Sequence, residues 1–158
     1  MRVTKRLNKP HPAIQAAREH YQHPYYPYDM MLWLPRNAAP HAAALDVSKD
    51  KFHRGLCILN ALLKACAKRG WITGTEWQIR TYVNTVMVDG KQITFRLRER
   101  CRQVERELTD EEREDLKRGR PVYRTKILQP TGSLHLTIKP GAGDGPHGWE
   151  DAPEAPLE

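Results

Sequence analysis

The feature that most restricts the possible folds of this chain is an apolar stripe within residues 49–69. Apolar side chains recur there at steps of three and four residues: Phe52, Leu56, Leu59, Leu63 and Cys66. This period places them on one face of an α-helix. Ser48 is a favourable N-cap before the stripe, and Gly70 is a favourable stop after it. We predict a helix of about 21 residues, roughly 32 Å long, that organises the core.

The next part of the chain has the composition and the spacing of β-strands. Residues 77–88 are rich in Val, Ile, Thr, Tyr and Trp, which favour strands. Asp89 and Gly90 follow and predict a two-residue hairpin turn. Residues 91–102 alternate between apolar and basic side chains, which predicts a returning strand. Its apolar face would be formed by Ile93, Phe95 and Leu97.

Two shorter helices are expected outside this region. Pro12 can occupy the first helical position, so residues 13–22 are predicted to form a short helix. Residues 109–112 have the pattern of a capping box and open a short acidic helix that ends at Gly119.

A second hairpin completes the predicted fold. Its strands would be residues 122–129 and 133–139, joined by a turn at Pro130-Thr131-Gly132. The fold class is therefore expected to be α+β. We predict an antiparallel sheet of about four strands, in two hairpins, packed against the long helix, with a short N-terminal helix and a short acidic helix.

Charge is distributed unevenly along the 158 residues, whose net charge is +7. Residues 140–158 hold five acidic residues and no Lys or Arg, so residues 1–139 carry +12. We expect residues 1–11 to be a flexible basic arm, residues 12–139 one domain and residues 140–158 a flexible acidic tail. A basic body favours a polyanionic partner, either nucleic acid or an acidic protein.

Composition also excludes several classes of protein. No apolar run approaches the ~18 residues that a membrane-spanning helix needs. No apolar segment follows the basic N-terminus, so a secretory signal is not expected. The three cysteines are widely spaced, which argues against a disulfide framework and suits a reducing compartment. We therefore expect a cytoplasmic protein without membrane contact.

Four arginines occupy the second face of the strand predicted over residues 91–102: Arg96, Arg98, Arg100 and Arg102. Alternate residues of a strand lie about 6.8 Å apart, similar to successive phosphates of a nucleic acid. A guanidinium can bind phosphate through two hydrogen bonds. Two other interpretations stay open. The arginines could be balanced by Glu residues on the neighbouring strand or by the acidic helix, which offers Glu111, Glu112, Glu114 and Asp115. Alternatively, residues 97–106 could form a helix with a solvated arginine face.

Further basic residues extend the predicted phosphate-binding surface. They are Lys64, Lys68 and Arg69 at the end of the long helix, and Lys5, Arg6 and Lys9 in the basic arm. Aromatic residues stand among basic ones at Trp71, Trp77, Tyr82 and Tyr123. They could stack on bases, but packing in the core explains them more simply.

A different hypothesis places a protein partner on the loop at residues 25–34. The loop is rich in aromatic residues and Met, which are enriched at protein interfaces. The candidate contacts are Tyr25, Tyr26, Tyr28, Met31 and Trp33.

Catalytic and metal-binding motifs are not found in the sequence. His53 and Cys57 are four residues apart on the predicted helix, but a buried structural cysteine is the simpler interpretation of Cys57. His135 would join the arginine face as a phosphate contact or as an exposed side chain. We expect no metal, no cofactor and no enzymatic activity.

Several segments together resemble one family of bacterial proteins of uncharacterised function. They are residues 10–14, the stretch Arg54 to Gly70, Val88-Asp89-Gly90 with residues 93–97, residues 130–134 and Trp149. Members of this family often occur near plasmid, phage or integrative-element genes. They often carry a helix-turn-helix-like segment before this region, which we do not expect in this chain, and a long charged helix after it. The resemblance implies a shared fold over residues 10–150 and carries over no catalytic residue. We therefore expect a non-catalytic bacterial or mobile-element protein that binds nucleic acid, or a complex bound to nucleic acid, independently of sequence.

Overall fold

The computed structural model describes residues 3, 5–23, 29–35, 37, 41–78, 81–140 and 147–150. Within these residues the chain forms three helices and six strands. In chain order they are α1 (Pro12–His20), β1 (Leu45–Asp46), α2 (Lys49–Lys68), β2 (Ile72–Gln78), β3 (Thr81–Val88), β4 (Lys91–Glu105), α3 (Asp110–Lys117), β5 (Lys126–Lys139) and β6 (His147–Glu150). The α+β class is confirmed, but the sheet has six strands rather than about four.

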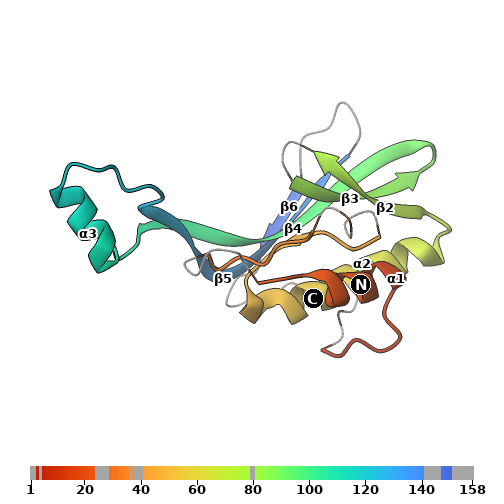
Figure 1. The fold of residues 1–158 in the computed structure, drawn as a ribbon. Helices are drawn as coiled ribbons and strands as arrows, with labels where there is room; N and C mark the ends of the chain where they lie inside the picture. The colour runs from red at the N-terminus through yellow and green to blue at the C-terminus, as the bar shows by residue number, and fades with distance from the viewer. Residues whose placement is uncertain are drawn as a thin grey trace.

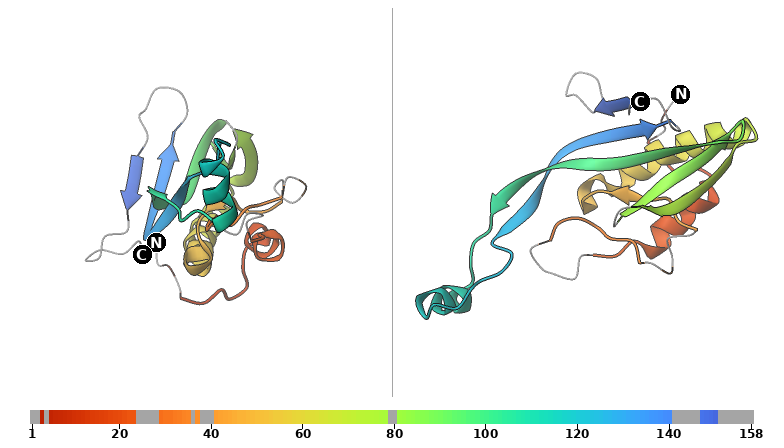
Figure 2. Two further views of the ribbon diagram at one scale, coloured as in Figure 1. Left: turned by 60° about the vertical axis from the view of Figure 1, so that its left-hand side comes forward. Right: turned by 90° about the horizontal axis from the view of Figure 1, so that it is seen from above.

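The sheet is mostly antiparallel, with strand order β2-β3-β4-β5-β6. The short strand β1 pairs with β4 in parallel, with Leu45 opposite Leu97. Helices α1 and α2 lie on one side of the sheet (Figure 1). Strands β4 and β5 continue beyond this body as a two-stranded ribbon that carries α3 at its end (Figures 1 and 2). We call residues 102–129 the projecting hairpin.

Helix α2 organises the core, as its apolar stripe predicts. Leu56, Leu59 and Leu63 are buried on its inner face and pack against buried residues of the sheet. Gly55 lies where α2 packs closely on the sheet, since a Cβ added there would meet the side chain of Leu45 at 3.3 Å. The helix predicted after Ser48 is thus confirmed.

The hairpin at Asp89 and Gly90 is also confirmed, and both residues have positive φ angles, of 49° and 76°. The capping box of α3 forms as well. The Thr109 hydroxyl accepts from the Glu112 N–H at 3.2 Å, and the Glu112 carboxylate accepts from the Thr109 N–H at 2.9 Å.

The predicted second hairpin is wrong. Pro130-Thr131-Gly132 does not reverse the chain but lies inside the continuous strand β5. The pairing with β4 shifts here, with Leu134 opposite Glu99 and Pro130 opposite Cys101. Proline and a glycine with φ of 84° are well suited to a bulge, since a bulge leaves residues out of the ladder. Strands β4 and β5 therefore form one long hairpin with α3 at its end.

Both predicted tails contribute ordered contacts. Val3 and Leu7 of the basic arm pack against the core. Four residues of the predicted acidic tail form β6, which pairs with β5 over residues 135–138.

Candidate nucleic-acid interface

The basic arm lies along α2. The Lys5 carbonyl is 3.1 Å from the His53 ring nitrogen Nε2, and the Asn8 carbonyl accepts from Lys64 Nζ at 2.9 Å. Farther along, the His11 N–H donates to the Asn60 side chain at 2.9 Å. The three contacted positions of α2 are spaced seven and four residues apart, which puts them in one stripe of the helix. The arm is therefore fixed along a single face of α2.

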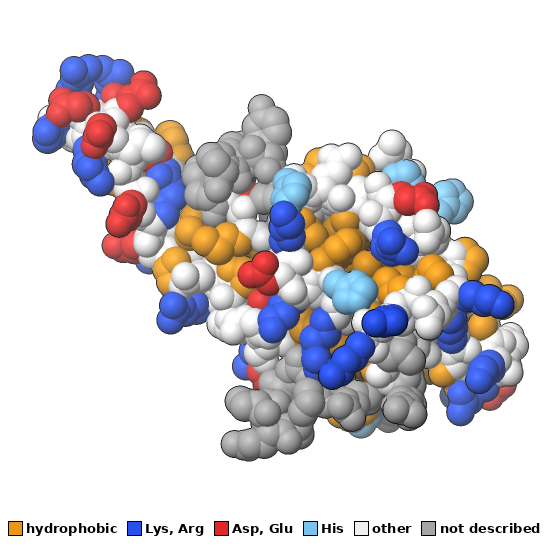
Figure 3. Space-filling view, turned by 90° about the horizontal axis from the view of Figure 1, so that it is seen from below, with side chains coloured by type: hydrophobic (Ala, Val, Ile, Leu, Met, Phe, Trp, Pro, Cys, Tyr) orange, Lys and Arg blue, Asp and Glu red, His pale blue; other side chains and the backbone are white. Residues whose placement is uncertain are grey.

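Basic side chains gather around this contact. Lys68 continues the stripe one turn beyond Lys64, roughly 6 Å along the helix. Lys5, Arg6 and Lys9 are exposed on the arm beside it. We call the combined surface the arm–helix face; it consists of Lys5, Arg6, Lys9, Lys64, Lys68 and Arg69. Figure 3 views this side of the molecule, where most of the visible Asp and Glu side chains gather at the projecting hairpin.

Five of the six cations of this face are not paired with a carboxylate in the part of the chain that the structure describes. In the described part of the chain, Lys5, Lys9, Lys64, Lys68 and Arg69 form no ion pair. Lys64 donates to a backbone carbonyl of the arm, and Arg69 donates to the Ala65 carbonyl at 3.1 Å. Since a carbonyl accepts a hydrogen bond without adding a negative charge, these five side chains keep their positive charge.

Trp71 adds an aromatic group at the end of this surface. The Arg69 guanidinium lies 5.5 Å from the centre of its ring, within the range of a cation–π contact. Trp71 and Tyr82 are both half-buried against the core, which confirms the simpler interpretation of these two aromatics. The side chain of Trp77 lies outside the described residues. Tyr123, by contrast, is 78% exposed.

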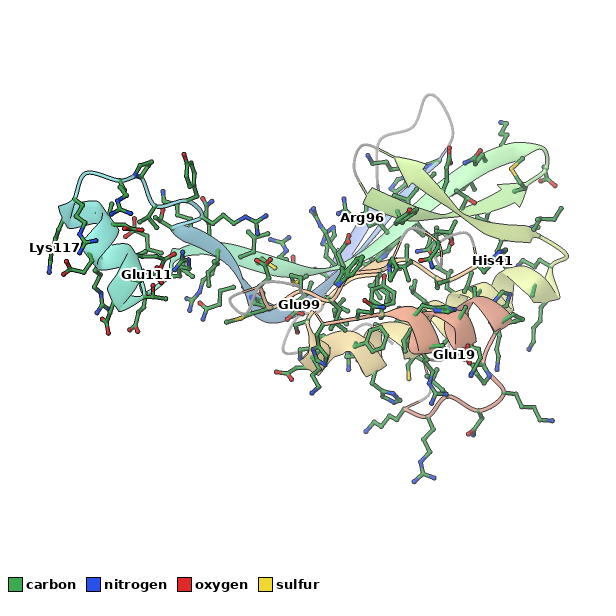
Figure 4. The ribbon with its side chains drawn as sticks, viewed as in Figure 1. Glu19, His41, Arg96, Glu99, Glu111 and Lys117 are labelled. Atoms are coloured by element: carbon green, nitrogen blue, oxygen red, sulfur yellow. The ribbon has the colours of Figure 1, made fainter. Side chains whose placement is uncertain are left out.

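The arginine face of β4 has a different character. Residues 91–102 are extended, so the helical alternative is wrong. Phe95 and Leu97 are buried on the α2 side, and the arginines alternate with them on the opposite side of the sheet (Arg96, Figure 4). The predicted spacing of the ladder is therefore present.

The guanidinium groups of this face are not all unshielded, so a phosphate-binding ladder of four free arginines is not present. Arg96 forms an ion pair with Asp46 at 2.6 Å, and Arg100 forms one with Glu150 at 2.5 Å. Arg102 donates to Gln129 at 2.7 Å. The shielding carboxylates belong to the strands β1 and β6 and not to the acidic helix α3, the other source of balancing charge that the sequence suggested. Among the described residues, only Arg98 of the four has neither an ion pair nor a side-chain hydrogen bond.

His135 lies on the arginine face, opposite Arg98 on β4 and Glu150 on β6. Its ring packs against Gly148, where an added Cβ would lie 3.0 Å from Nε2. Burial lowers the pKa of His135, and the neighbouring positive charges of Arg98 and Arg100 lower it further. Glu150 opposes these effects, but the net shift favours the neutral ring.

The loop proposed for a protein partner is only partly described. Tyr25, Tyr26 and Tyr28 lie outside the described residues. Met31 is half-buried and its sulfur lies 3.7 Å from Cys101 Sγ. Trp33 remains 45% exposed, with its indole N–H donating to the His23 carbonyl at 2.9 Å.

Glu99 is a buried charged residue that the sequence interpretation did not identify (Figure 4). Its carboxylate accepts from the Ser48 N–H and from the Gly132 N–H, each at 2.9 Å. It borders a groove of about 660 Å³ between α2 and the bulge of β5, which Lys49 and Lys51 also line. Glu99 therefore joins the start of α2 to the bulge. The sequence signal for the burial of Glu99 was its place in the alternation of β4, two residues after Leu97 and four after Phe95.

Other kinds of site find little support in the described residues. They contain no group of three or more His, Cys, Asp or Glu side chains that could hold a metal ion. No helix among them is long and apolar enough to cross a membrane. The chain matches no protein-family model, no curated protein and no solved structure. The function is therefore inferred from the surface itself.

Proposed function

We propose that the protein binds the phosphate backbone of nucleic acid through the arm–helix face, independently of sequence and without catalysis. The observation that carries this proposal is a set of five cations around the arm and α2 that form no ion pair among the described residues: Lys5, Lys9, Lys64, Lys68 and Arg69. Phosphates that approach this face gain ion pairs without displacing internal ones. Binding also releases counterions from the nucleic acid.

The arginine ladder is a secondary contact in this proposal. Arg98 is exposed and has no described ion pair, whereas Arg96 and Arg100 would have to exchange a carboxylate for a phosphate. Because an internal ion pair must break first, their net gain is smaller. The arm–helix face therefore contributes most of the affinity.

The test removes positive charge from this face without removing the contact that fixes the arm. Lys5, Lys9 and Lys68 have exposed side chains with no described hydrogen bond. We expect the triple change of these lysines to Gln to weaken binding to a labelled 20-base-pair duplex by about tenfold or more, since phosphate contacts dominate affinity. Fluorescence anisotropy at low salt measures the effect.

The control removes the same charge elsewhere. Lys91 and Lys139 are exposed on the sheet, and Arg113 pairs with Asp110 on α3. Changing these three residues to Gln gives the same net charge, and binding should stay within about threefold of wild type. Equal losses in the two triple variants would assign binding to net charge alone and refute the proposed face.

A protein partner at the loop is the alternative, favoured by the exposure of Met30 and Trp33 at 45% each. A partner held there by apolar contact would remain bound at high salt. Pull-down of one protein that is lost in the double variant Tyr26→Ala and Trp33→Ala, together with no duplex binding by wild type, would favour this alternative.

A further inference from the structure

Residues 117–126 of the projecting hairpin form a second basic segment, on the side of the molecule that α3 occupies. The segment contains five basic residues and no acidic one: Lys117, Arg118, Arg120, Arg124 and Lys126. Lys117 pairs with Glu114, Arg120 with Asp115, and Arg124 with Asp29. Arg118 and Lys126 are exposed and form no ion pair within the described chain.

Tyr123 stands in the middle of this segment. Its side chain is 78% exposed, and the phenol ring and hydroxyl make no hydrogen bond or ring contact among the described residues. It is the most exposed of the large hydrophobic side chains of the described structure. Figure 4 shows that this end of the hairpin extends away from the sheet and helices of the body. The ring is therefore open to a flat partner from outside.

The backbone that carries Tyr123 is held firmly, in contrast to its side chain. Arg106 is only 7% exposed at its side chain and forms two bonds to the Glu112 carboxylate. The same guanidinium donates to the Arg124 carbonyl at 2.8 Å and to the Tyr123 carbonyl at 3.4 Å. Arg124 has a positive φ of 55°, a conformation that a non-glycine residue adopts at a cost. The chain thus accepts strain next to a residue whose aromatic ring is exposed to solvent.

We propose that residues 117–126 bind single-stranded nucleic acid, with Tyr123 stacked on an unpaired base and with Arg118 and Lys126 bound to flanking phosphates. An exposed aromatic ring between free cations is the combination that non-specific single-strand binders use, because every base has a flat face. Paired bases in a duplex have no exposed face along the helix, so this contact selects unpaired segments. The inference rests on the proposed function: the arm–helix face holds the backbone, and the projecting hairpin adds a preference for single strands.

The experiment compares labelled oligothymidylate and oligouridylate with a duplex of the same length, using the full chain. We expect Tyr123→Ala to weaken binding of the single strands by about five- to 150-fold, the range measured for loss of one base–aromatic stack. Duplex binding should change by less than about threefold. Tyr123→Phe keeps the ring and should bind within about twofold of wild type.

Leu116→Ala provides the matched control, since Leu116 is 49% exposed on the adjacent α3. This variant should bind all three nucleic acids as wild type does. Equal weakening of single strands and duplex by Tyr123→Ala would overturn the stacking contact, as would unchanged single-strand binding. Failure of wild type to bind any of the three probes would instead refute the proposed function. A difference between the two single strands identifies DNA or RNA as the preferred ligand.

Discussion

His11 joins the basic arm to both α1 and α2. Its backbone N–H donates to Asn60 of α2, and its ring nitrogen Nδ1 accepts from the Ala13 N–H at 3.2 Å, capping α1. Only a neutral imidazole has a nitrogen that can accept. Burial lowers the pKa of His11, and the nearby Lys64 charge lowers it further. The folded protein therefore favours the neutral ring that the cap requires.

The stability of the protein should consequently depend on pH near neutrality. A histidine whose folded pKa lies below its unfolded value of 6.5 stabilises the protein fully above that pH, and this contribution falls as the pH drops through 6.5. His135 acts in the same direction. We expect the free energy of unfolding in urea to decrease from pH 7.5 to pH 5.5. In His11→Asn the decrease should be smaller, because Asn caps without titrating.

A control is available on the same helix. His20 is exposed at the end of α1 and makes no described side-chain hydrogen bond. His20→Asn should keep the full wild-type decrease. If His11→Asn loses as much stability on acidification as wild type, then the neutral cap does not contribute to the pH dependence.

At this scale the sequence identifies which residues carry charge but not which of them are paired. The spacing of Arg96 to Arg102 correctly predicted a ladder on one face of a strand. Asp46 lies 50 residues before Arg96, and Glu150 lies far beyond Arg100, so no local pattern could connect them. Tyr123 and Tyr82 are likewise aromatic residues in strand-like surroundings. Only the tertiary fold decides that Tyr82 packs against the core and Tyr123 does not.

At the scale of elements, the projecting hairpin needs its own stabilisation. An isolated two-stranded ribbon is marginally stable in water, and α3 has no buried residue. Arg106 compensates by binding the Glu112 carboxylate and the carbonyls of Arg124 and Glu107. Its N–H also donates to the Thr125 carbonyl at 2.9 Å. The buried guanidinium therefore fixes the end of the ribbon to α3.

Replacing this arginine should loosen α3 without unfolding the body. We expect Arg106→Met to raise amide hydrogen exchange in residues 109–125 by about tenfold or more, since hydrogen bonds to charged groups are stronger than those between neutral groups. Exchange in α2 should not change. Arg113→Met is the control, because Arg113 pairs with Asp110 on the exposed surface. Unchanged exchange in Arg106→Met would show that other contacts hold the hairpin.

Acid should not break the contact between Arg106 and Glu112 until the pH is low. The hydrogen bonds from Arg106 and from the Thr109 backbone lower the pKa of Glu112 to about 2. Because a depressed carboxyl pKa stabilises the fold above the unfolded value of 4.5 and loses that effect as the pH falls towards 2, the contact is intact at pH 5.5. Acidification between pH 7.5 and pH 5.5 therefore acts on His11 and His135, not on Glu112.

The elements themselves were largely predictable from local patterns. The stripe of α2, the turn at Asp89 and Gly90 and the capping box of α3 each depend on residues close in sequence. Pro130-Thr131-Gly132 was misassigned because the same residues suit a turn and a bulge. Whether these residues form a turn or a bulge depends on the pairing of Leu134 with Glu99 on the neighbouring strand. Strand β6 was not predicted because its four residues do not alternate between apolar and polar side chains. They are held only by pairing with β5 at the edge of the sheet.

At the scale of the whole molecule, basic residues lie on both faces of the sheet, and the ion pairs distinguish the two faces. On the face opposite α2, Asp46 and Glu150 pair with two of the four arginines. On the α2 side, the arm–helix face carries its positive charge without an ion pair at Lys5, Lys9, Lys64, Lys68 or Arg69 among the described residues. The formal charge of +7 thus understates the local charge that a polyanion would meet. The sequence identified both groups of cations, and the fold distinguishes them.

The most direct test of this distinction is the salt dependence of binding to the 20-base-pair duplex. The slope of log Kobs against log salt concentration changes by about 0.9 for each phosphate contact with a duplex. The variant with Lys5, Lys9 and Lys68 changed to Gln should therefore have a slope shallower than that of wild type by about 2 to 3. The control variant at Lys91, Arg113 and Lys139 should keep the wild-type slope. Equal slopes for wild type and the arm–helix variant would contradict the assignment of phosphate contacts to this face.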